Sequence, residues 1–130
     1  MLRIYCATGF KFMDNMIKLV ETIRNESILI STKCQFCIPQ LLTNTKHHSY
    51  VYSDIEGLRT SDVLLIHIPE PSVGACCELG FFKASKPHNP IIAYRCMDHP
   101  WIKHLSDFYV DDYNDVIDIL ETFLLSKTYS

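Results

Sequence analysis

The feature that most constrains the fold is a nearly continuous apolar run, VLLIHI, at Val63–Ile68. A strand that is buried on both faces, as in the middle of a parallel sheet, has such a run because neither of its faces contacts water. Strand character recurs at Leu2–Ala7, in a part of Ile28–Ile38, and at Pro90–Tyr94. His67 lies inside the central run, where a histidine is more often a hydrogen-bonded core residue than a catalyst.

Helical patterns alternate with these strands. Apolar residues recur at helical spacing over Phe12–Ile23, and Val116–Leu124 carries the apolar stripe of a closing helix. Ser53 or Asp54 is expected to cap a short helix through Leu58, since both side chains offer an oxygen to free backbone N–H groups.

Two polar or mixed segments, Thr43–Ser49 and Cys96–Phe108, are expected to be loops. The alternation of strands and helices predicts an α/β fold, with one doubly wound domain over residues 1–130. Its sheet is expected to be mostly parallel and flanked by helices, as in Rossmann-like and flavodoxin-like proteins.

Composition narrows the class of partner. The chain has 130 residues, 48% of them hydrophobic, and a net charge of −3. This charge does not provide the basic surface that binds a nucleic acid polymer. A few hydrogen-bond donors in one pocket could still bind a small anion. No apolar run approaches the length of a membrane span, and the N-terminus resembles a first strand more than a signal peptide. We therefore expect a cytoplasmic protein with a small-molecule ligand and no membrane partner.

The six cysteines raise the question of a zinc or redox site. Cys34 and Cys37 have CxxC spacing, but His47 and His48 are adjacent rather than spaced as a second ligand pair. Most of the cysteines lie in apolar runs, where a free thiol behaves as a small hydrophobic side chain. We expect buried thiols and no metal or cofactor, and a zinc or redox protein remains the alternative.

The segment PSVGACCELGFF, residues 71–82, follows the central strand directly. Ligands of open α/β sheets bind beyond the carboxyl ends of the strands, near helix N-termini. Ser72 is a good N-cap, and Gly74 allows a ligand to approach the backbone closely. Glu78 lies one helical turn later on the same side and has Phe82, not a cation, at i+4. Local sequence leaves open whether Glu78 is a solvated side chain or a functional one.

The segment Tyr52–Ser85 resembles the core of the nucleoside 2-deoxyribosyltransferase superfamily. The matching features are Asp54 at the opening of a short helix, Ser61-Asp62 before an apolar strand, and the GACCELG stretch at Gly74–Gly80. In addition, Ile4–Gly9 is similar to the family's first strand and ligand-contacting loop, and Ala93–Arg95 to a later strand.

Within this superfamily, PSVGACCELG is similar to the pattern of the 2′-deoxynucleoside 5′-monophosphate N-hydrolases. Deoxyribosyltransferases commonly have an aspartate six residues before the glutamate, where this chain has Ser72. The resemblance implies that Ser72, Gly74 and Thr8 bind the 5′-phosphate. The hydrolases also have an arginine in the first loop, whereas this chain has Phe10 and Lys11 there.

The resemblance implies an N-glycosidase in which Glu78 is the nucleophile. Asp54 would be the second carboxylate, with a plain helix cap as the alternative, and Tyr5 would face the sugar or base unless it is a core residue. Neither a metal nor a cofactor is needed. The other activities that remain open are base exchange by a deoxyribosyltransferase and non-catalytic nucleotide binding on the same fold.

Family members assemble as homodimers or larger homo-oligomers, in which a neighbour's loop often completes the pocket. The resemblance therefore implies an oligomer here, and Asp98–Phe108, with Trp101, is the segment expected to contribute to the neighbour.

Overall fold

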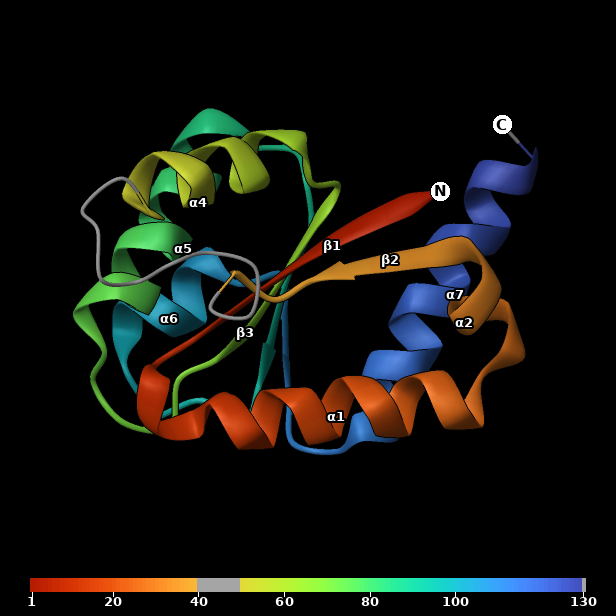
Figure 1. The fold of residues 1–130 in the computed structure, drawn as a ribbon, viewed down its shortest axis with the longest axis horizontal. Coiled ribbons are helices and arrows are strands. Elements are labelled where there is room, and N and C mark those ends of the chain that lie inside the picture. Colours follow the sequence, from red (N-terminus) through yellow and green to blue (C-terminus); the bar gives the residue numbers. More distant parts are fainter. Residues whose placement is uncertain (40–49, 130) are drawn as a thin grey trace.

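The structure is a computed structural model that describes residues 1–39 and 50–129, with side chains to residue 126. The expected loop at Thr43–Ser49, with His47 and His48, lies outside the described residues. The strands are β1 (Leu2–Thr8), β2 (Cys34–Cys37), β3 (Val63–His67), β4 (Ile91–Tyr94) and β5 (Phe108–Val110). They form one sheet in the order β2-β1-β3-β4-β5, and every pairing is parallel (Figure 1). The prediction of a doubly wound α/β fold is confirmed.

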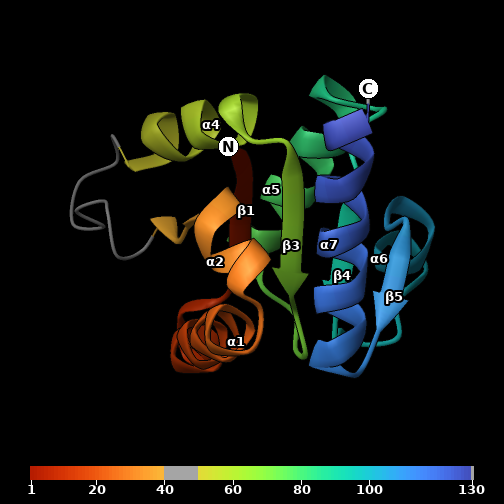
Figure 2. The same ribbon diagram turned by 90° about the vertical axis from the view of Figure 1, so that its right-hand side faces the viewer.

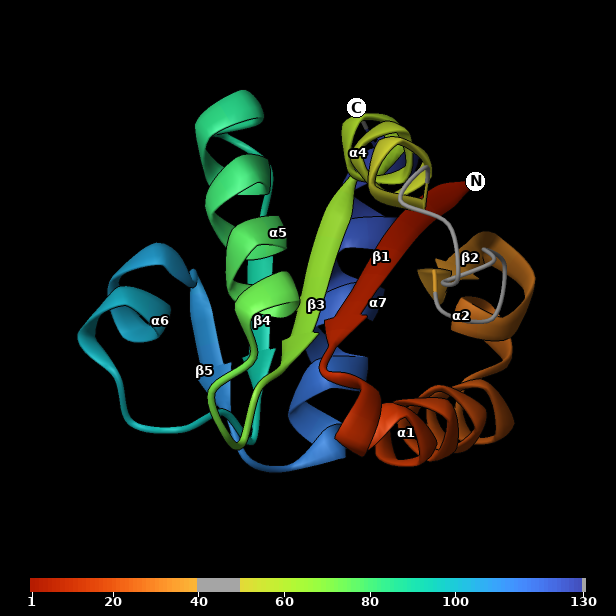
Figure 3. The same ribbon diagram turned by 60° about the vertical axis from the view of Figure 1, so that its left-hand side comes forward.

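Helices cover both faces of the sheet (Figures 2 and 3). On one face lie α1 (Met13–Glu26), α2 (Ile28–Lys33) and α7 (Tyr113–Tyr129), and on the other lie α4 (Tyr50–Thr60), α5 (Val73–Ser85) and α6 (Pro100–Leu105). A short 3-10 helix, η1 (Phe10–Phe12), joins β1 to α1. Among the described residues, no helix is both long and apolar enough to cross a membrane.

The central strand β3 joins the two cores. Val63 and Leu65 pack beneath α1 and α7, while Leu64 and Ile66 pack beneath α4 and α5. Successive side chains of a strand point to opposite faces, so a strand with helices on both faces is apolar at every position. The prediction that VLLIHI forms a central strand buried on both faces is thereby confirmed, since β3 lies in the middle of the sheet.

The second strand is shorter than the apolar pattern suggested. Ile28–Lys33 is the helix α2, and only Cys34–Cys37 is a strand. The hydroxyl of Ser27 accepts a hydrogen bond from the backbone N–H of Ile30 at 3.1 Å and caps this helix. The N-cap and the burial of Ile30 outweigh the strand propensity of the β-branched residues.

The prediction of a loop over Cys96–Phe108 is wrong for most of that segment. It contains α6, which starts with Pro100 and is capped by His99, and it ends at the edge strand β5. A helix of six residues and a strand of three residues are too short to show a periodic pattern of apolar residues in the sequence.

The expected cap at Ser53 or Asp54 is also wrong, because α4 already includes Tyr50. Asp54 lies in the second turn of α4 rather than at its opening, which differs from the family pattern that it was matched to. A side chain in the second turn does not cap the helix, so the position of Asp54 needs another explanation.

Candidate functional site

The chain leaves β1 and β3 toward opposite faces of the sheet. After β1 the chain enters η1 and α1, whereas after β3 it enters α5 on the other face. Thr8 and His67 are register partners, so both strands end at the same level. Such a divergence between neighbouring parallel strands opens a crevice at their carboxyl ends, where α/β proteins bind ligands.

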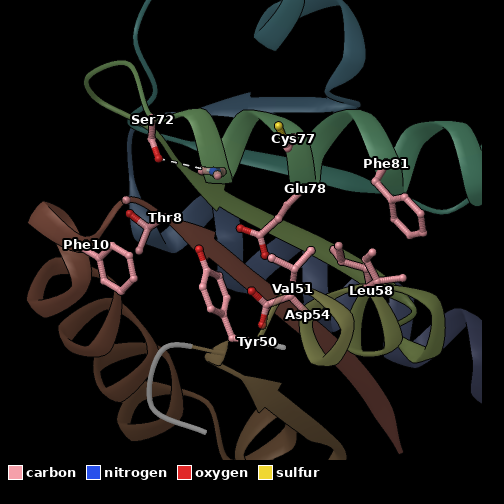
Figure 4. A pocket seen from close by; sticks show the side chains of 14 residues that line it. Thr8, Phe10, Tyr50, Val51, Asp54, Leu58, Ser72, Cys77, Glu78 and Phe81 are labelled. Carbon is pink, nitrogen blue, oxygen red and sulfur yellow. Dashed lines mark hydrogen bonds between the residues drawn. The ribbon is translucent and has the colours of Figure 1, made fainter. Parts of the chain in front are cut away.

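A cavity of about 520 Å³ lies at this crevice, on the side of α4 and α5. We call it the carboxylate pocket; its walls come from the end of β1, from α4 and from α5 (Figure 4). The residues that line it are Thr8, Gly9, Phe10, Tyr50, Val51, Asp54, Ile55, Leu58, Ser72, Gly74, Ala75, Cys77, Glu78 and Phe81. Five of the six site residues expected from the sequence are among them, and the sixth, Tyr5, lies beneath the pocket.

Glu78 reaches the pocket from the second turn of α5. Ser72 caps this helix as predicted, since its hydroxyl accepts a hydrogen bond from the backbone N–H of Ala75 at 3.4 Å. Leu79 and Phe82 bury the helix against the sheet, which turns Glu78 toward α4. Burial raises the pKa of Glu78 to about 7; the hydrogen bond from Tyr5 lowers it, and the charge of Asp54 raises it further.

Tyr5 is the hydrogen-bond partner of Glu78, a pairing that the sequence did not reveal. Its ring is fully buried in the core, and its hydroxyl donates to Oε2 of Glu78. A Cβ atom on Gly57 would lie 3.0 Å from Cε2 of Tyr5, so glycine lets α4 pack directly on the ring. Burial, followed by the charge of Glu78, raises the pKa of Tyr5, which therefore remains a donor.

Asp54 faces Glu78 across the pocket, and Figure 4 shows the two carboxyl groups directed toward each other. Within the described residues, the buried Oδ1 of Asp54 has no hydrogen-bond partner. Burial raises the pKa of Asp54 to about 6. A buried carboxylate oxygen without a partner is uncommon in folded proteins and is an available contact for a bound hydroxyl or N–H group.

The start of α5 offers donors at one end of the pocket. Among the described residues, none accepts a hydrogen bond from the backbone N–H groups of Val73 and Gly74. The hydroxyl of Ser72 accepts from the helix and therefore retains its own proton for donation. A Cβ atom on Gly74 would meet nothing within 4 Å, so the backbone here faces open space. Free N–H groups at a helix N-terminus are suited to an anion.

Thr8 is placed beside this end of the pocket, but its hydroxyl proton is already used. Oγ1 of Thr8 donates to the backbone carbonyl of His67 at 2.7 Å. The hydroxyl proton of Thr8 is therefore not available to a ligand.

The pocket has an acidic character. Among the described lining residues, Asp54 and Glu78 are charged and none is basic. Lys11, which follows the lining residue Phe10, pairs at 2.9 Å with Glu70. Both of these side chains are exposed, so their ion pair adds little stability.

Sequence reasoning missed several walls of the pocket, including Phe10, Tyr50, Cys77 and Phe81. Tyr50 and Phe81 could have been found from helical spacing, because Tyr50 precedes Asp54 by four residues and Phe81 follows Glu78 by three. Phe10 carried no such signal, because its position depends on η1.

The zinc or redox alternative finds little support in the thiols. All six cysteines are free. Burial raises the pKa of Cys34 to about 11 and also raises that of Cys37, which disfavours the reactive thiolate. Within residues 1–39 and 50–126, no three His, Cys, Asp or Glu side chains gather as a metal site.

No protein-family model and no curated protein matches the chain. Among solved structures, it is similar to a conserved protein from Enterococcus faecalis, with 18% sequence identity and a TM-score of 0.72. The match covers 94% of this chain and 98% of the other. At this level of identity, the similarity supports the fold.

Proposed function

We propose that the protein cleaves the N-glycosidic bond of a nucleoside 5′-monophosphate, or its deoxy form, and releases the free base, with Glu78 as the nucleophile. The observation that carries this proposal is the opposed pair of partly buried carboxyl groups, Glu78 on α5 and Asp54 on α4, in the carboxylate pocket. Glycosidic cleavage passes through an oxocarbenium-like state, which a nearby carboxylate stabilises and then captures.

Two steps account for the reaction. In the first, an ionised oxygen of Glu78 attacks C1′, the C1′–N bond breaks, and the base takes its electron pair and a proton from Asp54. In the second, water attacks C1′, gives a proton to Asp54, and displaces the carboxylate of Glu78 with its bonding pair. The net reaction consumes one water and yields the base and the sugar phosphate, and no metal or cofactor takes part.

Both carboxyl groups have pKa values near neutral pH, and the proposed reaction proceeds from the state in which Glu78 is ionised and Asp54 is protonated. The hydrogen bond from Tyr5 stabilises the ionised form of Glu78 and fixes its orientation. With pKa values of about 7 for Glu78 and about 6 for Asp54, both groups exchange protons near neutral pH. A group with a pKa near the working pH is an efficient proton donor or acceptor.

The 5′-phosphate would bind at the start of α5. Ser72 and the backbone N–H groups of Val73 and Gly74 are the available donors, and the dipole of the helix adds attraction for an anion. Thr8 would border this subsite, since it lines the same pocket.

A second candidate is base exchange by a deoxyribosyltransferase. It is favoured by the lack of a basic side chain among the described lining residues, because a pocket with two carboxyl groups repels a dianionic phosphate. In that reaction a second base replaces water in the second step and gives its N–H proton to Asp54.

Purified protein incubated with deoxynucleosides and with their 5′-monophosphates distinguishes these candidates. The released base is separated by chromatography, with and without an acceptor base. Release from monophosphates in water supports the hydrolase, and release only with an acceptor supports the transferase. Binding without release from any substrate would leave a non-catalytic nucleotide-binding protein and would contradict both enzymatic proposals.

We also propose a homodimer or larger homo-oligomer with α6 at the contact. The observation in its favour is Trp101, which is 70% exposed on α6. Light scattering tests the proposal, with Trp101→Ala expected to lower the measured mass. A monomer at all concentrations would contradict it.

A further inference from the structure

A second cavity, of about 370 Å³, opens at the same edge of the sheet but on the face of α1 and α7. We call it the basic cavity. The polar side chains that line it come from α1, from the ends of β3 and β4, and from the start of α7, and include Asn15, Lys18, His67, Arg95 and Tyr113. It shares no lining residue with the carboxylate pocket.

His67 lines this cavity and carries a buried acceptor nitrogen without a partner in the described residues. Its side chain is 5% exposed, and Nδ1 lies 2.8 Å from the backbone carbonyl oxygen of Tyr94. Because a carbonyl oxygen only accepts, Nδ1 carries the proton, and in the neutral ring Nε2 has a lone pair. Nε2 is buried and has no partner within the described residues. A buried polar atom of this kind calls for a ligand or another explanation.

Neighbouring rings fix the imidazole. The ring of Phe12 packs edge-on at 5.8 Å between centroids, and the ring of Tyr94 lies at 5.7 Å. Burial, together with the charge of Arg95, lowers the pKa of His67, which keeps the ring neutral and Nε2 an acceptor.

Two cations complete the lining, and no described lining residue is acidic. Arg95 is held by a hydrogen bond from Nε to the backbone carbonyl of Asp111 at 2.8 Å. Its backbone has a φ of 46°, in the left-handed region that costs a non-glycine residue free energy and often accompanies a functional position. Glu26 accepts a hydrogen bond from Tyr113 without lining the cavity itself.

We propose that the basic cavity binds a small oxyanion that carries its own hydroxyl group, such as phosphate at neutral pH or a hydroxylated phosphate monoester. Lys18 and Arg95 neutralise the anionic oxygens, and Nε2 of His67 accepts the hydroxyl proton. The lone pair of Nε2 beside two cations selects for an anion that also carries a hydroxyl proton. A fully deprotonated oxyanion would place an oxygen lone pair against the lone pair of Nε2, and the two would repel each other. The cavity has room for more than phosphate, so a monoester fits the same contacts.

Isothermal titration calorimetry with inorganic phosphate, sulfate and glycerol 3-phosphate tests the proposal. Sulfate matches the hydrogen phosphate dianion, one of the two forms of phosphate at neutral pH, in shape and charge but lacks its hydroxyl proton. We expect phosphate to bind at least about tenfold more tightly than sulfate, which corresponds to about 1.4 kcal/mol. Tighter binding of the monoester would identify an ester as the natural class, and weaker binding would identify free phosphate. Equal binding of phosphate and sulfate, or no binding of either phosphate or the ester at millimolar concentration, would overturn the proposal.

Variants locate the ligand. Lys18→Gln and Arg95→Asn are each expected to weaken phosphate binding about tenfold, since each removes one of the two cations. Asparagine is chosen at Arg95 because it tolerates the left-handed backbone. Lys33→Gln, on α2 outside the cavity, removes the same charge and is expected to leave the affinity unchanged.

His67→Gln tests the acceptor, with thermal unfolding as a check on the fold. Because Lys18 is exposed on α1, its variant tests the site even if the histidine variant does not fold. Loss of phosphate binding in Ser72→Ala, with no loss in Lys18→Gln, would place the anion in the carboxylate pocket and refute the proposal.

Discussion

The two cavities open at the same edge of one sheet and have opposite chemistry. The carboxylate pocket presents Glu78 and Asp54 without a basic residue in its described lining, whereas the basic cavity presents Lys18, Arg95 and the neutral His67 without an acidic one. Strand β3 separates them, because its last side chain turns to one face and the helix that follows lies on the other. The difference shows that local lining, rather than the net charge of −3, determines which ligand each face can bind.

The largest expected effect comes from Glu78→Gln. The amide keeps the shape of the side chain and its acceptor for Tyr5, but it cannot attack C1′. We expect base release to fall by about 10³-fold or more. Phosphate binding in the basic cavity should be unchanged, which sharpens the contrast between the two sites. Glu56→Gln, an exposed acid on α4, is the matched control. Retention of base release by the Glu78 variant would refute the assignment of the nucleophile.

The second prediction concerns stability, because the carboxylate pocket holds two partly buried acids whose pKa values are raised. The pKa of Glu78 is raised from its ordinary value of 4.5 to about 7 in the folded protein. The folded state therefore binds more protons than the unfolded state between these values, and the free energy of unfolding falls as pH rises through this window. The loss from Glu78 is at most about 3 kcal/mol.

Urea unfolding at pH 4.5 and pH 8 measures this loss. Glu78→Gln should remove the part of the pH dependence that Glu78 contributes, leave the part due to the raised pKa of Asp54, and make the protein more stable than wild type at pH 8. An equal change in the free energy of unfolding between pH 4.5 and pH 8 for wild type and variant would show that Glu78 is not desolvated. The two cavities would then differ less in the burial of their charged groups than we infer.

Asp54→Asn is expected to reduce base release by about 10²-fold, the usual contribution of a general acid. The amide cannot give a proton to the leaving base, while the other walls of the pocket remain in place. Asp118→Asn on α7 is exposed on the opposite face of the sheet and should have wild-type activity. A wild-type rate for Asp54→Asn with substrates that have poor leaving groups would exclude it as the acid.

The smallest expected effect is that of Tyr5→Phe, which removes the hydrogen bond to Glu78 but keeps the buried ring. Without this donor the pKa of Glu78 rises further, so the acid limb of the pH–rate profile should move to higher pH. We expect a loss of about tenfold at pH 6 and a smaller loss at pH 8. A loss of equal size at every pH would indicate that Tyr5 only supports the fold.

Sequence reasoning succeeded where the contacts are local. Ser72, Gly74 and Glu78 lie on one helix directly after the central strand, and their spacing placed them together before the structure did. The sheet could likewise be predicted, because a strand buried on both faces leaves an unbroken apolar run.

It was less informative where partners are far apart in the chain. The bond between Tyr5 and Glu78 spans 73 residues, and nothing in either segment specifies the other. Ser53 or Asp54 was expected to cap a helix that in fact already includes Tyr50, because the end of a helix is the part that a sequence pattern defines least.

The basic cavity was not foreseen at all. His67 was correctly expected to be hydrogen-bonded in the core, but among the residues that the structure describes only one of its nitrogens has a partner. Lys18 lies on α1 and Arg95 directly follows β4, so several strands of the sheet lie between them in sequence. The two residues line one cavity only because the parallel strands place their carboxyl ends at the same edge of the sheet.

The most direct test of the central claim, that Glu78 captures the sugar, is intact-protein mass spectrometry during turnover. A 2′-fluoro-substituted nucleoside 5′-monophosphate slows breakdown of the covalent intermediate, because fluorine destabilises the oxocarbenium-like state that leads to and from it. We predict an added mass equal to that of the fluorinated sugar phosphate, located by digestion on the peptide that contains Glu78 and absent in Glu78→Gln. Base release from this substrate with no adduct, or with an adduct on another residue, would contradict the account.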